Sequence, residues 1–330
     1  MKNWRLLPFG RYPAGENMAI DEAVFREVGR NGGPPTLRFY GWSAPAVSIG
    51  YFQAPAAEID LDACREAGVV LVRRPTGGKA VYHDGDLTYA VVAPERNPLF
   101  PPTIIGTYEA ISRCLVRGLD RLGLEAVLAA GDGAAPGGTP EEMPGAGTFD
   151  PGHESPAHNF PPGSDDEWKD TTPASGGGAG GENRRGPVMA KTEAKMTLAA
   201  CFAVPSRHEL LVAGRKICGS AQVRSRRAFL QQGSLLMDFD PDKTAAVLTG
   251  RGRTREEQAR ILRGRATAVY EHLPRAVTAE MVIATLRAAF QELWKVSFVP
   301  EALTPAEEML AGRLLATKYG RESWNLKGRM

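Results

Sequence analysis

Residues 73–89 read Arg73-Arg-Pro-Thr-Gly-Gly-Lys-Ala-Val-Tyr-His-Asp-Gly-Asp-Leu-Thr-Tyr89, and this stretch is the most informative part of the chain for its fold. Apolar runs of the buried-strand type lie at its two ends, at residues 69–72 and 87–92. Between them Gly77 and Gly78 lack the Cβ atom that would block unusual backbone dihedrals or the close approach of a ligand. The pattern therefore predicts a glycine turn between two strands, with amide groups that could face a carbonyl or phosphate oxygen.

Basic side chains lie on both sides of this turn. Arg73, Arg74 and Lys79 would surround a bound oxygen with positive charge. Paired glycines between strands are more often a simple turn, so the pattern alone leaves a structural and a functional interpretation open.

Composition limits the class of protein. The chain has 330 residues, enough for one large domain or two smaller ones, and a formal net charge of +2. A nearly neutral chain is not expected to bind nucleic acid through bulk electrostatics. The first residues contain no long apolar stretch of the signal-peptide type, and no later window approaches a membrane span, so we expect a cytoplasmic protein without a membrane partner.

Helix and strand signals are mixed along the chain, which predicts an α+β (mixed α/β) fold with a central, largely antiparallel or mixed sheet flanked by helices. Asn17 is a candidate cap for a helix that ends near Gly29, and Ala213-Gly214 is a hairpin turn signal between strands near 209–212 and 216–218. Amphipathic helices are expected at residues 278–294 and 305–319. We expect one large domain at residues 1–275 and a small helical C-terminal lobe at 276–330 that packs on it.

Residues from about 130 to 195 have a different composition, rich in glycine and proline with few aromatic residues. Such a segment cannot bury enough apolar surface to offset the entropy of ordering it, so we expect a disordered insertion in a surface loop. Its His153 and His158 have no accompanying cysteine or acidic pattern and are expected to be solvated rather than to bind a metal.

The four cysteines show neither a Cys-x-x-Cys pair nor a zinc-type histidine spacing, so no metal site and no disulfide framework is indicated. Cys64 and Cys114 fall on helical segments and are expected in the core. Cys218 lies two residues after Lys216, on the same face of an extended strand, and is assigned to packing. From its neighbours alone, Cys201 is most simply another small buried residue.

The pattern at 73–84 resembles the signature of the biotin/lipoate protein ligase superfamily, whose lipoate branch carries Arg-Arg-x-x-Gly-Gly-x-Ala-Val-x-His-Asp. Five further matches follow the family order and span nearly the whole chain except about residues 130–195. They are Asn17-Met-Ala-Ile-Asp-Glu-Ala23, Leu37-Arg-Phe-Tyr-Gly-Trp42, Ser48-Ile-Gly-Tyr-Phe-Gln53, Gly214-Arg-Lys-Ile-Cys-Gly-Ser-Ala-Gln222 and Lys318-Tyr-Gly-Arg-Glu-Ser-Trp-Asn325. The resemblance implies the catalytic fold of that superfamily.

One further segment separates the branches of the superfamily. Ala-Cys-Phe-x-x-Pro-Ser-x-x-Glu-Leu at residues 200–210 is similar to the cysteine-containing stretch of the octanoyltransferase branch, where the thiol carries the acyl group as a thioester. The resemblance implies that Cys201 is the nucleophile and that Lys216 is the cation that contacts the acyl carbonyl and favours the thiolate. Thioester exchange followed by amide formation needs no ATP, so no cofactor is expected.

The remaining site residues are also implied by the resemblance. Acyl or substrate binding is expected of Arg73, Gly77, Gly78, Lys79, His83 and Gly219. Lys79 stands where the ligases generally have a third glycine, and its long side chain should crowd the place of an adenylate, which favours transfer over ligation. His83 is either a general base for the incoming amine or a structural hydrogen-bonding residue.

The acyl chain needs an apolar slot, and at about 0.8 kcal/mol per methylene an eight-carbon tail could contribute on the order of 5 kcal/mol of binding. Strand phase suggests five lining residues, each of which is equally well explained as core: Tyr40, Ile49, Tyr51, Val81 and Tyr89.

The resemblance therefore implies an octanoyltransferase of lipoate biosynthesis. Its donor would be octanoyl-acyl carrier protein, and its acceptor a lysine of a lipoyl-domain protein such as the glycine-cleavage H protein. Three alternatives remain open: an ATP-dependent lipoate-protein ligase, an amidotransferase that moves octanoyl between lipoyl domains, and a catalytically silent lipoyl-binding protein.

Overall fold

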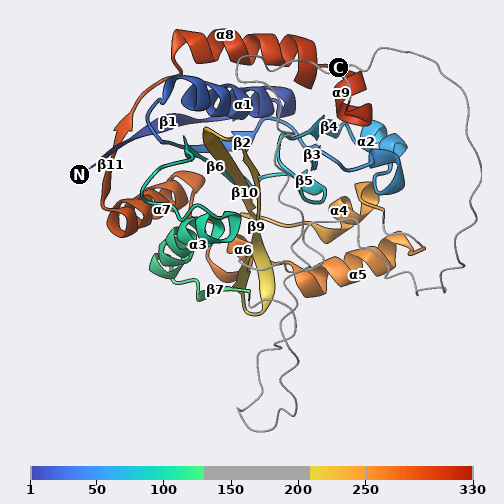
Figure 1. The fold of residues 1–330 in the computed structure, drawn as a ribbon. Coiled ribbons are helices and arrows are strands. Elements are labelled where there is room, and N and C mark those ends of the chain that lie inside the picture. Colours follow the sequence, from blue (N-terminus) through green and yellow to red (C-terminus); the bar gives the residue numbers. More distant parts are fainter. Residues whose placement is uncertain (1, 130–208, 250–251, 329–330) are drawn as a thin grey trace, which may run out of the picture.

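The computed structural model describes residues 2–129, 209–249 and 252–328 (Figure 1). Two sheets organise these residues, a large one of eight strands and a small one of three. The expected insertion at 130–195 and the proposed nucleophile Cys201 lie outside the described residues.

The large sheet is mixed, as the sequence predicts. Its strands, in spatial order, are β11 (Val296–Pro300), β1 (Lys2–Tyr12), β2 (Thr36–Trp42), β6 (Leu87–Pro94), β10 (Ala228–Leu235), β9 (Arg215–Arg224), β8 (Leu210–Val212) and β7 (Ala126–Leu128). β1 runs parallel to both of its neighbours, and the pairs from β2 to β7 are antiparallel. β6 is almost wholly buried because helices cover both faces of the sheet, which explains its continuous apolar run.

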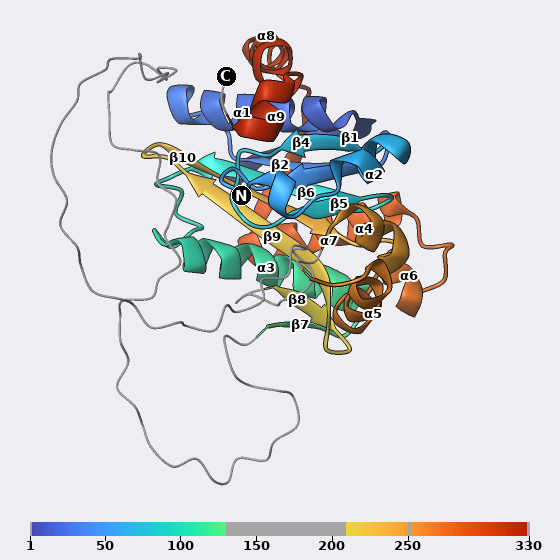
Figure 2. The same cartoon turned by 90° about the vertical axis from the view of Figure 1, so that its right-hand side faces the viewer.

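Helices form a layer on each face of the large sheet (Figures 1 and 2). α1 (Ala14–Asn31) and α8 (Pro305–Leu314) lie on one face, and α3 (Ile104–Arg121) and α7 (Ala279–Trp294) on the other. Each layer packs around its own apolar cluster, with Val24, Tyr40 and Leu314 in the first and Phe39, Leu115 and Phe290 in the second. The two faces of one sheet therefore belong to two different cores.

The small sheet lies beside the large one and has the order β4 (Val70–Arg73), β3 (Ala46–Ile49), β5 (Val81–His83). A third apolar cluster joins it to α2 (Leu61–Glu66), α4 (Pro241–Val247) and α5 (Arg255–Arg265). The remaining short helices are η1 (Pro55–Ala57), α6 (Val269–His272), the π-helical turn η3 (Leu315–Tyr319) and α9 (Glu322–Lys327).

Local sequence signals account for several boundaries. Ala213 and Gly214 have φ values of 49° and 73°, so they form a two-residue turn of the type that matches hairpin twist, and the predicted hairpin β8–β9 is confirmed. The assignment of Asn17 as a helix cap was wrong. α1 starts at Ala14, directly after Pro13, and the buried Asn17 amide instead donates to the carbonyl oxygens of Tyr12 and Gly41.

Of the helices in the C-terminal segment, α7 and α8 lie in different layers. α7 packs on α3, β11 adds a parallel strand to the edge of the large sheet, and α8 packs on α1. Arg5 of β1 donates two hydrogen bonds to Glu307 of α8, and both side chains are buried. Apolar faces on both α7 and α8 draw the segment onto opposite sides of the sheet.

The stretch at residues 73–89 connects the two sheets. It leaves the small sheet at β4, turns at the glycine pair, returns as β5 and enters the large sheet as β6. β4 and β5 do not pair with each other, because β3 lies between them. The glycine turn therefore crosses the end of β3 at the junction of the sheets.

Candidate active site

A cavity of about 40 Å³ lies at this junction. Both sheets and α1 contribute to its wall, which consists of Met18, Tyr40, Trp42, Ser48, Arg74, Gly78, Val81, His83, Thr88, Gly219, Ser220, Ala221, Gln232, Gly233 and Ser234. The wall thus combines apolar rings with hydroxyl, amide, imidazole and guanidinium groups, the mixture expected of a small-molecule site.

The glycine turn forms one edge of the cavity. Gly78 has a φ of +88°, a backbone conformation that favours glycine. A Cβ atom on Gly50, at the end of β3, would lie 2.0 Å from the Gly78 carbonyl oxygen, so the two backbone segments touch. The turn is held further by the Tyr51 amide, which donates to the Thr76 carbonyl oxygen over 2.9 Å.

Arg74 fixes the turn from inside. Its guanidinium donates to the carbonyl oxygens of Gly77 and Lys79 at 2.6 and 2.8 Å, and to that of Ser48 at 3.0 Å. The same group lies 3.3 Å from the Ser48 hydroxyl oxygen. A permanent positive charge is therefore placed at the cavity wall, beside a serine hydroxyl.

Three polar side chains form a chain of hydrogen bonds at the wall. His83 Nε2 lies 2.8 Å from Ser48 Oγ, and His83 Nδ1 lies 2.9 Å from Asp86 Oδ2. All three side chains are buried, and Ser48 and His83 line the cavity. The Trp42 ring stacks on the imidazole, with centroids 3.9 Å apart and planes 18° apart. The imidazole is thereby held in one orientation.

Asp86 is ionised in this arrangement. Burial alone would raise the pKa of its carboxyl group, but the charge of His83 and the hydrogen bonds from His83, Ser234 and Thr88 outweigh that effect and lower the pKa below its ordinary value. All three donors share Oδ2. The other oxygen, Oδ1, is buried and has no hydrogen-bond partner within the part of the chain that the structure describes.

A second buried network lies at the α1 side of the cavity. Asp21 accepts hydrogen bonds from Tyr40, from Gln232 and from the Arg38 guanidinium, at 2.8, 2.6 and 2.5 Å respectively. Burial and the Asp21 carboxylate hold the pKa of the Tyr40 hydroxyl well above its ordinary value, so Tyr40 remains a neutral donor. Thr76, next to the glycine pair, donates to the Gln232 side-chain oxygen over 3.0 Å. Hydrogen bonds through Thr76 and Gln232 thus connect the glycine turn to Asp21 on α1.

Arg73 points away from the cavity. Its guanidinium donates to six main-chain carbonyl oxygens, three in the segment after β3 and three in α9; these belong to Gly50, Tyr51, Gln53, Trp324, Asn325 and Leu326. Its side chain thereby ties the C-terminal helix to the back of the glycine turn. Burial lowers the pKa of the Arg73 guanidinium, which nevertheless stays charged.

Lys216 is fully buried at the start of β9, and its ammonium donates a hydrogen bond to the Glu209 carboxylate. It is not part of the cavity wall, although Gly219, three residues further along the strand, is. Of the expected site residues, the structure brings Gly78, His83 and Gly219 together at the cavity. Gly77 and the half-buried Lys79 contribute the carbonyl oxygens that hold Arg74.

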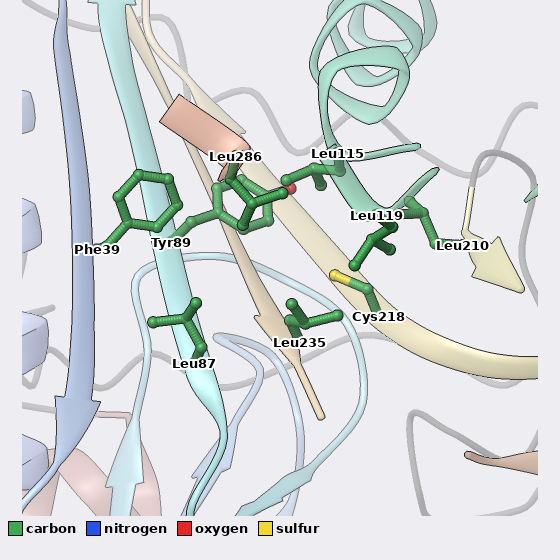
Figure 3. A pocket seen from close by; sticks show the side chains of 9 residues that line it. All are labelled: Phe39, Leu87, Tyr89, Leu115, Leu119, Leu210, Cys218, Leu235 and Leu286. Carbon is green, nitrogen blue, oxygen red and sulfur yellow. The ribbon is translucent and has the colours of Figure 1, made fainter. Parts of the chain in front are cut away.

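Cys218 faces the opposite side of the large sheet. It borders a second, apolar cavity of about 10 Å³ below α3, together with Leu119, Leu210 and Leu235 (Figure 3). Cys64 and Cys114 are buried in helices, as predicted. Burial and the nearby Asp60 raise the pKa of the Cys64 thiol to about 11, and burial alone raises that of Cys114.

The five residues suggested for an acyl slot divide among three places. Tyr40 and Val81 line the cavity between the sheets, while Tyr89 borders the apolar cavity on the other face. Ile49 belongs to the cluster under the small sheet, and Tyr51 packs at the edge of the α1 layer. The alternation of residues along a strand could not predict which of these residues would line the cavity and which would lie in an apolar cluster.

Ser48, Trp42 and Asp86 were not predicted to be site residues. The signal for Asp86 was present in His83-Asp84-Gly85-Asp86, where it is the second aspartate, and not the adjacent one, that reaches the imidazole. Asp84 instead accepts a hydrogen bond from Lys243 at the surface. Ser48 is the first residue of the motif Ser48-Ile-Gly-Tyr-Phe-Gln53, but its contact with His83 depends on the pairing of β3 with β5, which the motif does not reveal.

No helix in the described ranges is both long and apolar enough to cross a membrane. In the same ranges, no group of three or more histidine, cysteine or acidic side chains is arranged to hold a metal ion.

Comparisons with known proteins agree with the fold and the expected family. The family model of the lipoyl protein ligase A/B catalytic domain matches residues 13–135 and 186–291. An octanoyltransferase LipM of Symbiobacterium thermophilum is 37% identical over 326 residues, which cover 98% of each chain. One of Kyrpidia tusciae is 35% identical over 328 residues, 99% of this chain and 100% of that one.

Among solved structures, a bipartite lipoate protein ligase of Thermoplasma acidophilum, studied with its E2 lipoyl domain, is 25% identical with a TM-score of 0.69 and covers 99% of this chain and 97% of that chain. The expected fold class and the expectation of a transferase are confirmed by these relatives. The chain belongs to the lipoyl protein ligase A/B catalytic domain family.

Proposed function

We propose that the chain transfers an octanoyl group from octanoyl-acyl carrier protein to a lysine of a lipoyl-domain protein such as the glycine-cleavage H protein. The observation that carries this proposal is the nearly full-length likeness to octanoyltransferases. The cavity between the sheets supports it, because Tyr40, Val81 and Trp42 offer apolar surface to an acyl chain, while Arg74 places a positive charge at the wall where the carbonyl oxygen would lie.

The proposed reaction has two halves. The thiol of Cys201 first takes the acyl group from the carrier thioester, and the lysine amine then attacks the enzyme thioester. Thioester exchange is nearly isoenergetic and amide formation is downhill, so no ATP and no other cofactor takes part. Lys216 would place its positive charge near the thioester, as the sequence similarity implies.

A mass measurement tests the thioester. The purified chain is incubated with octanoyl-carrier protein and without ATP, and its intact mass is measured. We expect one octanoyl adduct on the wild-type chain, and no adduct on the Cys201→Ala variant. The Cys64→Ala variant is the matched control, because Cys64 is a buried core thiol on α2, and it should acquire the adduct normally. An adduct that persists in Cys201→Ala would remove Cys201 from the mechanism.

An ATP-dependent lipoate-protein ligase is the second candidate, because a solved structure with a similar fold is a lipoate protein ligase. It would need free octanoate and ATP. If the acceptor lysine is octanoylated when free octanoate and ATP are the only acyl source, the chain is a ligase. Our proposal excludes this result. An amidotransferase would instead prefer an octanoylated lipoyl domain over the acyl carrier protein as donor.

A further inference from the structure

Ser48, His83 and Asp86 form a directional hydrogen-bond chain whose order follows from protonation. The ionised Asp86 can only accept, so the imidazole nitrogen that faces it, Nδ1, carries a hydrogen. In the neutral form of the imidazole the other nitrogen, Nε2, is an acceptor, and the Ser48 hydroxyl donates to it. The Ser48 oxygen keeps lone-pair capacity at a wall of the cavity.

From this arrangement we propose that Ser48, His83 and Asp86 act as a proton relay that takes the proton from the acceptor lysine amine as it attacks the acyl thioester. The proposal rests on the proposed octanoyl transfer and assigns it residues beyond Cys201 and Lys216. Ser48 would contact the amine, His83 would receive the proton, and Asp86 would position and stabilise the imidazole.

The chemistry needs such a group. An amine loses a proton when it becomes an amide nitrogen, and proton transfer by a positioned base is worth about 10²–10⁴-fold in rate. The ammonium of Lys216 donates to the Glu209 carboxylate and in that state has no lone pair with which to accept a proton. His83 lines the cavity, and its Nε2 atom faces the Ser48 hydroxyl, which also lines the cavity.

The step balances without a co-reactant. The amine nitrogen bonds to the acyl carbon and the carbon–sulfur bond breaks. One amine proton moves to Ser48 Oγ while the Ser48 hydroxyl proton moves to His83 Nε2, and the imidazolium then gives its proton to the departing thiolate sulfur. The products are an amide and a thiol, and Ser48 and His83 return to their starting states.

The surroundings favour each transient charge. Asp86 faces Nδ1, and its second oxygen is buried without a hydrogen-bond partner among the residues described, so its negative charge remains available to an imidazolium. The Arg74 guanidinium lies 3.3 Å from the Ser48 oxygen and stabilises negative charge that develops there. Thr88 accepts from the Trp42 indole and donates to Asp86, which locks the ring that stacks on His83.

The test compares two nucleophiles in the complete chain. Octanoyl-carrier protein is the donor, and the acceptor is either an apo lipoyl domain or hydroxylamine. Hydroxylamine is a weak base, so its nitrogen, once bonded to the acyl carbon, is acidic enough to lose its proton to water without a positioned base. The variants are Ser48→Ala, Ser48→Thr and His83→Gln. The matched control is His272→Gln, because His272 Nε2 also lies 2.8 Å from a hydroxyl, that of Thr267, but outside the cavity.

We expect Ser48→Ala and His83→Gln to slow transfer to the lipoyl-domain lysine by about 100-fold or more and to leave transfer to hydroxylamine nearly unchanged. Ser48→Thr should keep most of the lysine activity, and His272→Gln all of it.

Equal slowing with both nucleophiles would assign Ser48 and His83 a structural role and overturn the relay, as would unchanged lysine transfer in Ser48→Ala. If His83→Gln does not fold, Ser48→Ala decides the test alone, since it removes one hydroxyl. A wild-type chain that transfers octanoyl to neither nucleophile would contradict the proposed function itself, which separates the two failures.

Discussion

The large sheet has a hollow on each face, and the same four strands build both. Towards α1, Tyr40, Thr88, Gly219 and Ser234 border the cavity of about 40 Å³ with its polar side chains. Towards α3, the neighbouring residues Phe39, Leu87, Cys218 and Leu235 border an apolar cavity of about 10 Å³ (Figure 3). Successive residues of a strand point to opposite faces, so adjacent positions serve different purposes.

Buried charge is unevenly distributed between the two faces, and on the α3 side Arg224 pairs with Glu95 and donates to Thr107 of α3. The α1 side holds the ion pairs Asp21–Arg38 and Glu22–Lys318, and the Ser48–His83–Asp86 chain lies beside it. The cluster on the α3 side is built from aliphatic and aromatic side chains with Cys114 and Cys218. We therefore expect changes around the cavity on the α1 side to alter the reaction, and changes in the apolar cluster on the α3 side to alter stability alone.

The largest expected effect is on the reaction, from Asp86→Asn. The asparagine amide would donate to His83 Nδ1 and impose the tautomer with hydrogen on Nε2, so transfer to the lysine should fall about 10³-fold, or about 4 kcal/mol in the barrier. Steady-state transfer rates measure it. Asp84→Asn, two residues earlier at the surface, is the control and should retain activity. Equal activity in the two variants would contradict the role given to Asp86 beside the cavity.

On the α3 side, Leu235→Ala should lower the free energy of unfolding by about 3 kcal/mol, because it enlarges a cavity that already exists next to this buried side chain. Urea denaturation measures the loss. The same substitution at the exposed Leu293 of α7 should cost no more than about 0.5 kcal/mol. Transfer by the folded Leu235→Ala chain should match wild type, and a large loss would show that the α3 side takes part in the reaction.

Glu22→Gln tests the buried charges of the α1 side. Burial raises the pKa of the Glu22 carboxyl, but Lys318 and Arg26, together with hydrogen bonds from Lys318 and Tyr319, outweigh it and bring the pKa below the ordinary 4.5. A lowered folded-state pKa stabilises the fold above pH 4.5, and this stabilisation disappears as the pH falls through the folded-state value.

Glu22→Gln should therefore cost about 2 kcal/mol at neutral pH and flatten the acid limb of the stability profile. Chemical denaturation between neutral and acidic pH measures both effects. Glu27→Gln, on the same helix but paired with a half-exposed arginine, is the control and should leave the profile nearly parallel to wild type. A Glu22→Gln profile parallel to wild type would contradict the assignment.

The smallest effect is expected from Cys218→Ala. Removing one sulfur from the wall of the small apolar cavity should cost about 1 kcal/mol of stability. Transfer should be unchanged, although Cys218 is only two residues from Lys216. Thermal unfolding measures the loss of stability, and the transfer rate shows whether the thiol takes part in the reaction. A drop in transfer beyond tenfold, without unfolding, would make Cys218 a functional thiol.

Much of this architecture could be predicted from the sequence, because buried strands, glycine turns and amphipathic helices leave local patterns. The hairpin at Ala213-Gly214 and the glycine turn at Gly78 are examples. The different directions of Arg73 and Arg74 could not be predicted, since they depend on where α9 packs. Ser48 meets His83 only because β3 and β5 pair antiparallel with Ser48 opposite Val81.

The most direct measurement of the central claim is the intact mass of an apo lipoyl domain after incubation with this chain and octanoyl-carrier protein, in the absence of ATP. The account predicts one octanoyl group on the acceptor lysine of the wild-type reaction, and about 10³-fold slower appearance with Asp86→Asn. Modification that appears only with free octanoate and ATP would contradict it.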